Sequence, residues 1–171
     1  DNGITLIDTA AIYGFGRSEE IVGKAVSEYG DRDKIIIATK AGLDWTSGKV
    51  YRNSTKSRIF QEVDESLKRL QADYIDIYQI HWPDFETPFE EAAEAMRELY
   101  DSGKIRAIGD SNYTIEHKDI FSEIAPIHTS QPPYNLFERG IEDDIFPYCK
   151  EHGITPESVA PIIKEANKNV Q

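Results

Sequence analysis

The chain has 171 residues, with 19 lysine or arginine against 31 aspartate or glutamate, which gives a formal net charge of −12. No stretch gathers basic residues into a stripe that could follow phosphates, so nucleic acid and anionic membrane surfaces are excluded as expected partners. No apolar run reaches the length of a membrane span and the amino end lacks a signal-peptide pattern, so we expect a cytoplasmic protein.

Five short β-branched, apolar runs predict strands, at residues 4–7, 35–39, 74–80, 105–108 and 127–130. Between them, apolar residues recur at three- and four-residue spacing, most clearly over residues 60–70 and 89–99, which predicts amphipathic helices. Strand and helix therefore alternate as in βαβ units, and we expect a parallel sheet with helices packed on it.

Single residues mark the expected ends and interior of the helices. Ser18 can cap a helix with an acidic first turn, and Gly30 and Gly103 stand where helices should stop. Cys149 is the only cysteine and lies in the apolar register of a helical stretch. We expect it to be a buried small hydrophobic residue rather than a nucleophile.

A polar side chain comes at or just after the end of each predicted strand. These residues are Asp8, Lys40, His81, the Ser111-Asn112 pair and Gln131. The carboxyl ends of parallel strands gather at one face, where ligands bind in barrels and doubly wound sheets. We therefore expect these residues, which are scattered along the sequence, to meet in one cleft.

Tyr13 follows the first strand and is a candidate proton donor, provided that its pKa is brought down from its ordinary value. Lys40 could lower that pKa as a neighbouring ammonium, with Asp8 as its counterion. His81 could donate a hydrogen bond to a substrate carbonyl. The other three histidines are expected to be structural or surface groups.

Four aromatic residues lie in or beside loops at the expected mouth of the cleft: Phe15, Trp45, Tyr51 and Trp82. They could wall an apolar substrate pocket, and ordinary loop packing is the alternative for each. Gly14 and Gly16 indicate a tight turn, because the third glycine of a dinucleotide fingerprint is missing. No metal site is predicted.

Ordered motifs carry a resemblance to a known family. They are Ile7-Asp8-Thr9-Ala10 with Tyr13-Gly14, Ala38-Thr39-Lys40, Asp73-Tyr74-Ile75-Asp76 with His81-Trp82-Pro83, Gly103-Lys104-Ile105-Arg106 with Ser111-Asn112, and Gln131-Pro132-Pro133-Tyr134-Asn135. Together they resemble the aldo-keto reductases, and most closely the bacterial branch that includes general stress protein 69.

The resemblance implies an α/β fold, the (β/α)8 TIM barrel, and reduction of aldehydes or ketones by hydride from NADPH, with NADH possible. It implies that Tyr13 is the general acid, Lys40 and Asp8 its tuning pair, and His81 the group that orients the carbonyl. The nicotinamide carboxamide would be held by Ser111, Asn112 and Gln131.

Two other functions stay open beside the reductase, namely a non-enzymatic cofactor-sensing or cofactor-binding subunit and an inactive fragment. A sugar-processing barrel is disfavoured, because no pair of strand-end carboxylates lies near Tyr13. The oligomeric state and the physiological substrate are not indicated by the sequence.

The resemblance covers residues 1–154 as a partial barrel, with strands two to six of eight, and residues 155–171 form an expected helical tail. Either further residues, before Asp1 and between Ile154 and Thr155, complete the barrel, or the chain is a fragment, and the sequence leaves both open. A polypeptide of these 171 residues alone should bind the reduced cofactor weakly and self-associate through open sheet edges.

Asp110 departs from the family pattern, which usually has a small apolar residue before Ser111-Asn112. A carboxylate buried there without a partner costs several kcal/mol. The sequence therefore predicts that Asp110→Val is neutral or stabilising.

Overall fold

A computed structural model describes residues 3–157 of the chain. The helices and strands, in chain order, are β1 (Leu6–Asp8), α1 (Arg17–Tyr29), η1 (Arg32–Lys34), β2 (Ile36–Ala41), β3 (Leu43–Thr46), β4 (Lys49–Arg52), α2 (Lys56–Leu70), β5 (Ile77–Ile80), α3 (Phe89–Asp101), β6 (Ile108–Ser111), α4 (Ile115–Ser122), β7 (Thr129–Gln131), η2 (Gly140–Glu142), α5 (Ile145–His152) and β8 (Thr155–Pro156).

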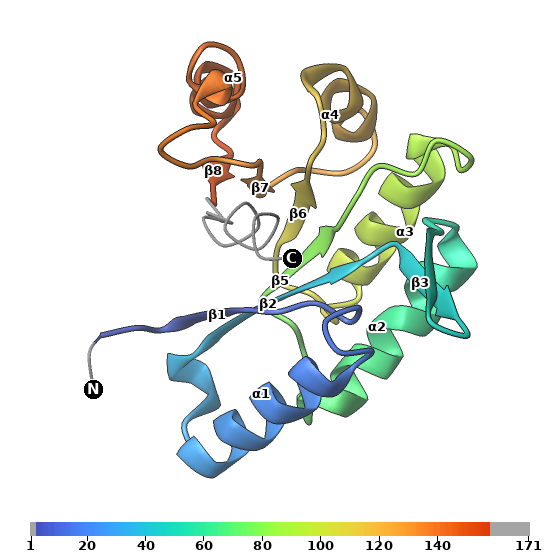
Figure 1. The fold of residues 1–171 in the computed structure, drawn as a ribbon, viewed down its shortest axis with the longest axis vertical. Coiled ribbons are helices and arrows are strands. Elements are labelled where there is room, and N and C mark those ends of the chain that lie inside the picture. Colours follow the sequence, from blue (N-terminus) through green and yellow to red (C-terminus); the bar gives the residue numbers. More distant parts are fainter. Residues whose placement is uncertain (1–2, 158–171) are drawn as a thin grey trace, which may run out of the picture.

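Six strands form one parallel sheet in the order β1-β2-β5-β6-β7-β8. Apart from β3 and β4, which form a separate hairpin, the strands lie in the sheet in their chain order. The helices follow one another in an arc around the sheet (Figure 1). This curled sheet with its helices is the architecture of part of an α/β barrel, as the sequence predicts.

All five predicted strands are present, but they begin one to three residues later than the apolar runs. The first starts at Leu6 rather than Ile4, whose side chain is 80% exposed. The consequence is that Asp8, Lys40, Ser111 and Gln131 belong to the strands themselves, at or near their last residues.

A sixth strand, β8, pairs with β7 through Thr155 and Pro156. The sequence gives no sign of it, because two residues are too short to show alternation and one of them is proline. The helical pattern expected after it, on Val159, Ile162, Ile163 and Ala166, lies outside the described residues.

The two amphipathic helices bury the predicted residues, including Val63 of α2 and Met96 of α3, neither of which is exposed. They pack in one core with Ile37, Tyr78 and Ile108 from three strands of the sheet. Burial of large apolar side chains of this kind contributes about 1.5–3 kcal/mol each. The core thus fixes the strands whose ends carry the polar residues.

The predicted helix ends are correct at Gly30 and Gly103, both of which adopt left-handed backbone conformations. The cap predicted at Ser18 is wrong. Helix α1 begins one residue earlier, at Arg17, after Gly16 as N-cap. The Ser18 hydroxyl instead lies 2.8 Å from that of Thr9 and ties the helix to the end of β1.

An antiparallel hairpin, β3–β4, stands apart from the main sheet and was not predicted. Its two turn residues, Ser47 and Gly48, both have positive φ angles, the geometry that suits a two-residue hairpin turn. The hairpin interrupts the connection from β2 to α2, at the carboxyl end of β2.

Cys149 is fully buried in α5, as predicted. Among the described helices, none combines the length and the apolar character that a membrane crossing requires.

Candidate active site

The carboxyl ends of the strands bring the predicted polar residues together at one edge of the sheet. Lys40 pairs in register with Gln79 of β5, and Ser111 with Gln131 of β7. His81 follows β5 directly, and its backbone N–H donates to the carbonyl of Ala41, 2.9 Å away. The shared edge confirms that these residues meet in space.

Lys40 is buried beside the carboxylate of Asp8. Its ammonium nitrogen lies 2.7 Å from each carboxylate oxygen and 2.9 Å from the carbonyl oxygen of Thr9. Burial lowers the pKa of Lys40, and Asp8 opposes that effect. The predicted pairing of Lys40 with Asp8 is present, and it occupies the donors of the ammonium.

Tyr13 lies in the turn between β1 and α1, with 41% of its surface exposed. Its ring meets that of His81 edge-on at 5.7 Å between centroids, and the Lys40 ammonium is 5.4 Å from the ring centre. Tyr13, His81 and Lys40 therefore form one group, as the sequence predicts.

The pKa of Tyr13 is raised, by burial first and by the negative charge of Asp8 second. The expectation that Lys40 lowers this pKa is therefore wrong for this arrangement. The physical reason is that the Lys40 ammonium is directed at Asp8 and Thr9, so that its charge is largely compensated. Tyr13 is protonated at neutral pH, which is the form that a proton donor needs.

Ser111, Asn112 and Gln131 form a linked set of polar groups next to His81. The Ser111 hydroxyl donates to the backbone carbonyl of Gln131 at 2.9 Å. The Asn112 amide donates to the carbonyl oxygen of His81 at 3.0 Å and to the Ser111 hydroxyl at 2.9 Å. The side-chain amide of Gln131 donates to Asp8 at 3.3 Å.

Asn112 adopts a positive φ of 64°, a conformation that is uncommon outside glycine and tends to occur at functional sites. This turn of the backbone directs the Asn112 side chain back toward His81. Because its amide nitrogen is engaged, the carbonyl oxygen of Asn112 is the part available to a ligand donor.

A cavity of about 550 Å³ opens at this edge of the sheet. It is lined by Ile12, Tyr13, Leu43, His81, Trp82, Ser111, Asn112, Gln131, Pro132 and Pro133. Six of these are predicted site residues. Asp8 and Lys40 are not among the lining residues.

The four predicted pocket aromatics divide into one that lines the cavity and three that do not. Trp82 is in the lining, whereas Phe15, Trp45 and Tyr51 are not. Phe15 packs against Trp45 at 5.8 Å between ring centroids, so ordinary loop packing describes this pair. The aliphatic lining residues Ile12 and Leu43 were not predicted from the sequence. Ile12 precedes Tyr13 directly, which is the signal that was available.

Within residues 3–157, no three histidine, cysteine, aspartate or glutamate residues are grouped so that they could hold a metal ion.

Asp110 directly precedes Ser111 and is buried, but it is not unpaired. Its carboxylate contacts the buried ammonium of Lys118 from α4, and it accepts a hydrogen bond from the Ser130 hydroxyl at 3.1 Å. The ammonium also donates to Ser130 at 2.7 Å. The expectation that Asp110→Val is neutral or stabilising assumed a carboxylate without a full partner. Its Oδ2 atom indeed has no hydrogen-bond partner among the described residues, but its Oδ1 atom faces a fully buried ammonium that the substitution would leave unpaired.

A second buried carboxyl, Glu62 of α2, lies next to the cavity wall and accepts the backbone N–H of Gly42 at 2.9 Å. Burial raises the pKa of Glu62 to about 8, against the opposing effects of the Gly42 hydrogen bond and Arg58. Glu62 thus keeps its proton at neutral pH in the folded protein.

This proton predicts a pH dependence of stability. From the ordinary pKa of 4.5 up to about 8, the folded chain holds a proton that the unfolded chain releases. The contribution of Glu62 to stability is therefore complete below the unfolded pKa and falls as pH rises, by up to about 1.4 kcal/mol per pH unit.

We expect Glu62→Gln to remove this slope, as measured by urea unfolding at about pH 5 and pH 8. Glu28→Gln, at an exposed site of α1, is the control that should keep it. An identical slope in parent and Glu62→Gln would contradict the assignment.

The comparisons with known proteins agree with this geometry. A family model described as the aldo/keto reductase family matches residues 1–164, and so extends beyond Ile154, where the sequence analysis placed the end of the resemblance. Aldo-keto reductase YhdN of Bacillus subtilis (strain 168) is 62% identical over 155 residues, which cover 91% of this chain and 47% of that protein.

Solved structures show the same likeness. The glycerol dehydrogenase AKR11B4 from Gluconobacter oxydans matches with a TM-score of 0.88 and 51% identity, over 91% of this chain and 49% of that one. An aldo/keto reductase from Klebsiella pneumoniae, solved in complex with NADP and acetate, matches with a TM-score of 0.80 and 32% identity, over 98% of this chain and 56% of that one. The chain spans about half the length of the curated relatives that it matches. It belongs to the aldo/keto reductase family.

Proposed function

We propose that this protein reduces an aldehyde or ketone to the alcohol, with a reduced nicotinamide cofactor as the hydride source. The observation that carries the proposal is the cavity that Tyr13 and His81 share with Ser111, Asn112 and Gln131. A proton donor, a hydrogen-bonding imidazole and a set of amides at one cavity suit carbonyl reduction better than any other chemistry that these groups support.

In this proposal Tyr13 gives its phenolic proton to the carbonyl oxygen as negative charge develops there. Because its pKa is raised, Tyr13 is protonated before the reaction begins. His81 would hydrogen-bond the same oxygen. The Lys40–Asp8 ion pair, whose ammonium lies 5.4 Å from the centre of the Tyr13 ring, would keep a fixed and largely compensated charge beside the phenol.

The residues of the cavity fit a nicotinamide carboxamide. The side-chain amides of Asn112 and Gln131 donate within the protein, to His81 and Asp8 respectively, which leaves their carbonyl oxygens for the N–H groups of the carboxamide. When bound, the reduced cofactor supplies the hydride. NADPH is the proposed cofactor, supported by the NADP in the Klebsiella structure, and NADH is the alternative.

The lining favours a substrate with an apolar body. Ile12, Leu43, Trp82 and the Pro132-Pro133 pair form its walls, and an aryl aldehyde would offer them a flat apolar surface. The cytoplasmic location stays a prediction.

The test is to incubate the full chain with NADPH and 4-nitrobenzaldehyde, and to follow both loss of the reduced cofactor and formation of the alcohol. We expect the two to be equal, with no cofactor loss when the aldehyde is left out. Saturable NADPH binding without alcohol formation would instead support a cofactor-binding subunit. Neither binding nor turnover would contradict the proposal for this chain.

A further inference from the structure

The β3–β4 hairpin forms part of the cavity wall, although it belongs to neither the main sheet nor a helix. Leu43, its first residue, lines the cavity. Trp45, two residues later, packs against Phe15 in the loop that carries Tyr13. The position of the hairpin therefore sets where the Leu43 side chain stands in the cavity wall. It also determines how Trp45 packs against the loop that carries Tyr13.

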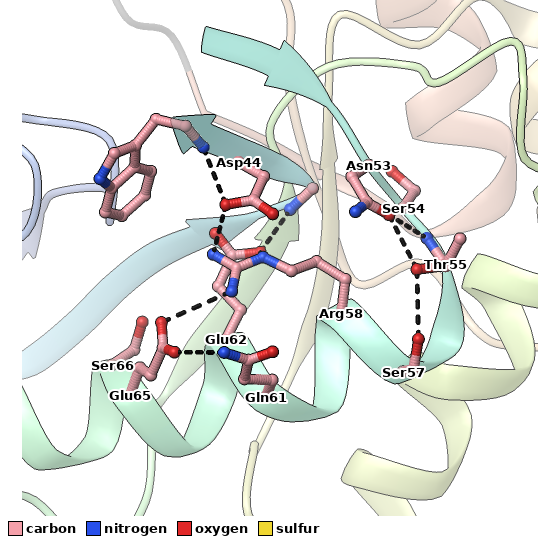
Figure 2. A network of polar contacts seen from close by, with 12 residues as sticks. Asp44, Asn53, Ser54, Thr55, Ser57, Arg58, Gln61, Glu62, Glu65 and Ser66 are labelled. Atoms are coloured by element: carbon pink, nitrogen blue, oxygen red, sulfur yellow. Dashed lines mark hydrogen bonds and ion pairs between the residues drawn. The ribbon is translucent and has the colours of Figure 1, made fainter. Parts of the chain in front are cut away.

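One buried arginine joins this hairpin to helix α2. The Arg58 side chain is only 9% exposed, and its guanidinium lies 3.4 Å from Asp44 of the hairpin and 3.6 Å from Glu65 of α2 (Figure 2). The guanidinium carbon also lies over the Trp45 ring, 5.9 Å from its centroid. Arg58 itself does not line the cavity.

Asp44 carries this contact into both strands of the hairpin. One of its carboxylate oxygens accepts the backbone N–H of Trp45 at 2.8 Å and also faces Arg58, and the other accepts the Tyr51 hydroxyl at 3.1 Å. A single carboxylate thus ties Arg58 to β3 and to β4. Loss of either charge would remove the ion pair through which Arg58 holds both strands.

The residue before Leu43 is held by the same helix. Gly42 has a φ of +87° and donates its N–H to Glu62, one turn along α2 from Arg58. A β-carbon at Gly42 would lie 2.8 Å from the Ser54 hydroxyl, so the backbone has little room to shift. Leu43 is therefore fixed from both sides by α2.

Stability alone does not account for the buried arginine. Its Nε lies 3.9 Å from the Glu62 carboxylate, beyond hydrogen-bond distance, and has no hydrogen-bond partner among the described residues. A buried charge with an unpaired donor contributes little net stability. A rigid, forked guanidinium is instead well suited to holding one arrangement of several groups.

We propose that Arg58 is a positioning residue for substrate selection. From outside the cavity it fixes the β3–β4 hairpin through Asp44, and so sets the size of the carbonyl compound that the cavity admits. The selection of substrate rests on the proposed reductase function, whereas the fixing of the hairpin does not.

The first experiment reports the hairpin without any need for activity. In a Trp82→Phe background, Trp45 is the only tryptophan of the chain, so its emission and its quenching by acrylamide report its surroundings. We expect Arg58→Met to shift the emission to longer wavelength and to increase quenching. Arg97→Met, which removes an exposed arginine paired with Asp101, is the matched control and should leave both unchanged.

Asp44→Asn provides a second variant in case Arg58→Met does not fold, because it removes the charge from the half-buried hairpin and leaves α2 intact. It should reproduce the change in Trp45, and the double variant should add nothing to it. Trp45 signals identical to the parent in every variant that folds would overturn the proposal.

The second experiment keeps Trp82 and measures reduction of 4-nitrobenzaldehyde and of the much smaller glyoxal. For Arg58→Met we expect KM for the aryl aldehyde to rise about tenfold, equal to roughly 1.4 kcal/mol of lost binding, with kcat and the KM for glyoxal unchanged. Arg58→Lys should recover part of the loss. Equal losses for both substrates would indicate a purely structural role and overturn the proposal. A parent chain without turnover would refute the reductase function and its substrate selection, while the Trp45 experiment would still decide the fixing of the hairpin.

Discussion

Replacing Tyr13 with phenylalanine should lower kcat for carbonyl reduction by about 10²–10⁴-fold, the range that general acid catalysis contributes. The substitution removes one hydroxyl from the cavity and keeps the ring that faces His81. Because the lost proton transfer acts only in the transition state, cofactor affinity should stay within a few fold. Steady-state kinetics at saturating aldehyde, together with a cofactor titration, measure both quantities.

The matched control is Tyr29→Phe, which removes the hydroxyl of an exposed tyrosine at the end of α1 and should leave kcat unchanged. A Tyr13→Phe variant that keeps most of the parent kcat would exclude Tyr13 as the proton donor. His81 would then be the remaining acid in the cavity lining.

Replacing Asp110 with valine should destabilise the protein by about 3–5 kcal/mol, the cost of leaving one partner of a buried ion pair alone. The Lys118 ammonium is fully buried, and without Asp110 it would keep only the Ser130 hydroxyl as a hydrogen-bond partner in the described part of the chain. Urea unfolding of both proteins gives the free energy difference. The expected direction is opposite to the one that the sequence indicated.

The double variant Asp110→Val with Lys118→Met separates charge from packing. Exchange of a buried ion pair for apolar residues of similar size is often neutral or stabilising, so the double variant should recover most of the stability lost by the single one. A single Asp110→Val variant as stable as the parent would show that the Lys118 charge finds another partner.

The sequence was sufficient to predict the parallel sheet and the meeting of most of the strand-end residues at one edge of it. Each strand run has a polar residue at its carboxyl end, and in a parallel sheet these ends share one edge. The convergence of His81, Ser111 and Gln131 on one cavity follows from that rule. The rule places residues at an edge, but it does not fix where their donors point.

The pairing of Asp110 with Lys118 is beyond such a rule. The two residues are eight apart, on β6 and α4, and the contact depends on how the helix packs against the sheet. A faint signal existed, since Lys118 lies three residues before the buried Phe121 on the same helix face. A lysine on the buried face of a helix indicates that a buried carboxylate lies nearby, because a buried ammonium needs a partner.

The hairpin was missed for a different reason. Its turn is Ser47-Gly48, which is a weaker hairpin signal than Asn-Gly or Asp-Gly. The strand Lys49–Arg52 is exposed along its whole length, so it lacks the alternation that marks a half-buried strand. As a result Trp45 and Tyr51 were assigned to loops at the mouth, and the role of Leu43 in the wall was not foreseen.

The sequence predicted which residues surround Tyr13 but not the direction in which its pKa is shifted. The sequence placed Lys40 near Tyr13 and Asp8 near Lys40, and both contacts are present. It did not show that the three N–H groups of the ammonium would donate to Asp8 and Thr9. Burial and the charge of Asp8 therefore raise the pKa of Tyr13.

The most direct test of the proposed chemistry is to follow the transferred hydrogen. The chain would be incubated with 4-nitrobenzaldehyde and with NADPH in which deuterium replaces both hydrogens on the reactive nicotinamide carbon. The alcohol would then be analysed by mass spectrometry. Hydride transfer in the cavity of Tyr13 and His81 predicts one deuterium on the carbinol carbon of every product molecule, and loss of that product in Tyr13→Phe. Alcohol without deuterium, or labelled alcohol formed equally well by Tyr13→Phe, would contradict the account.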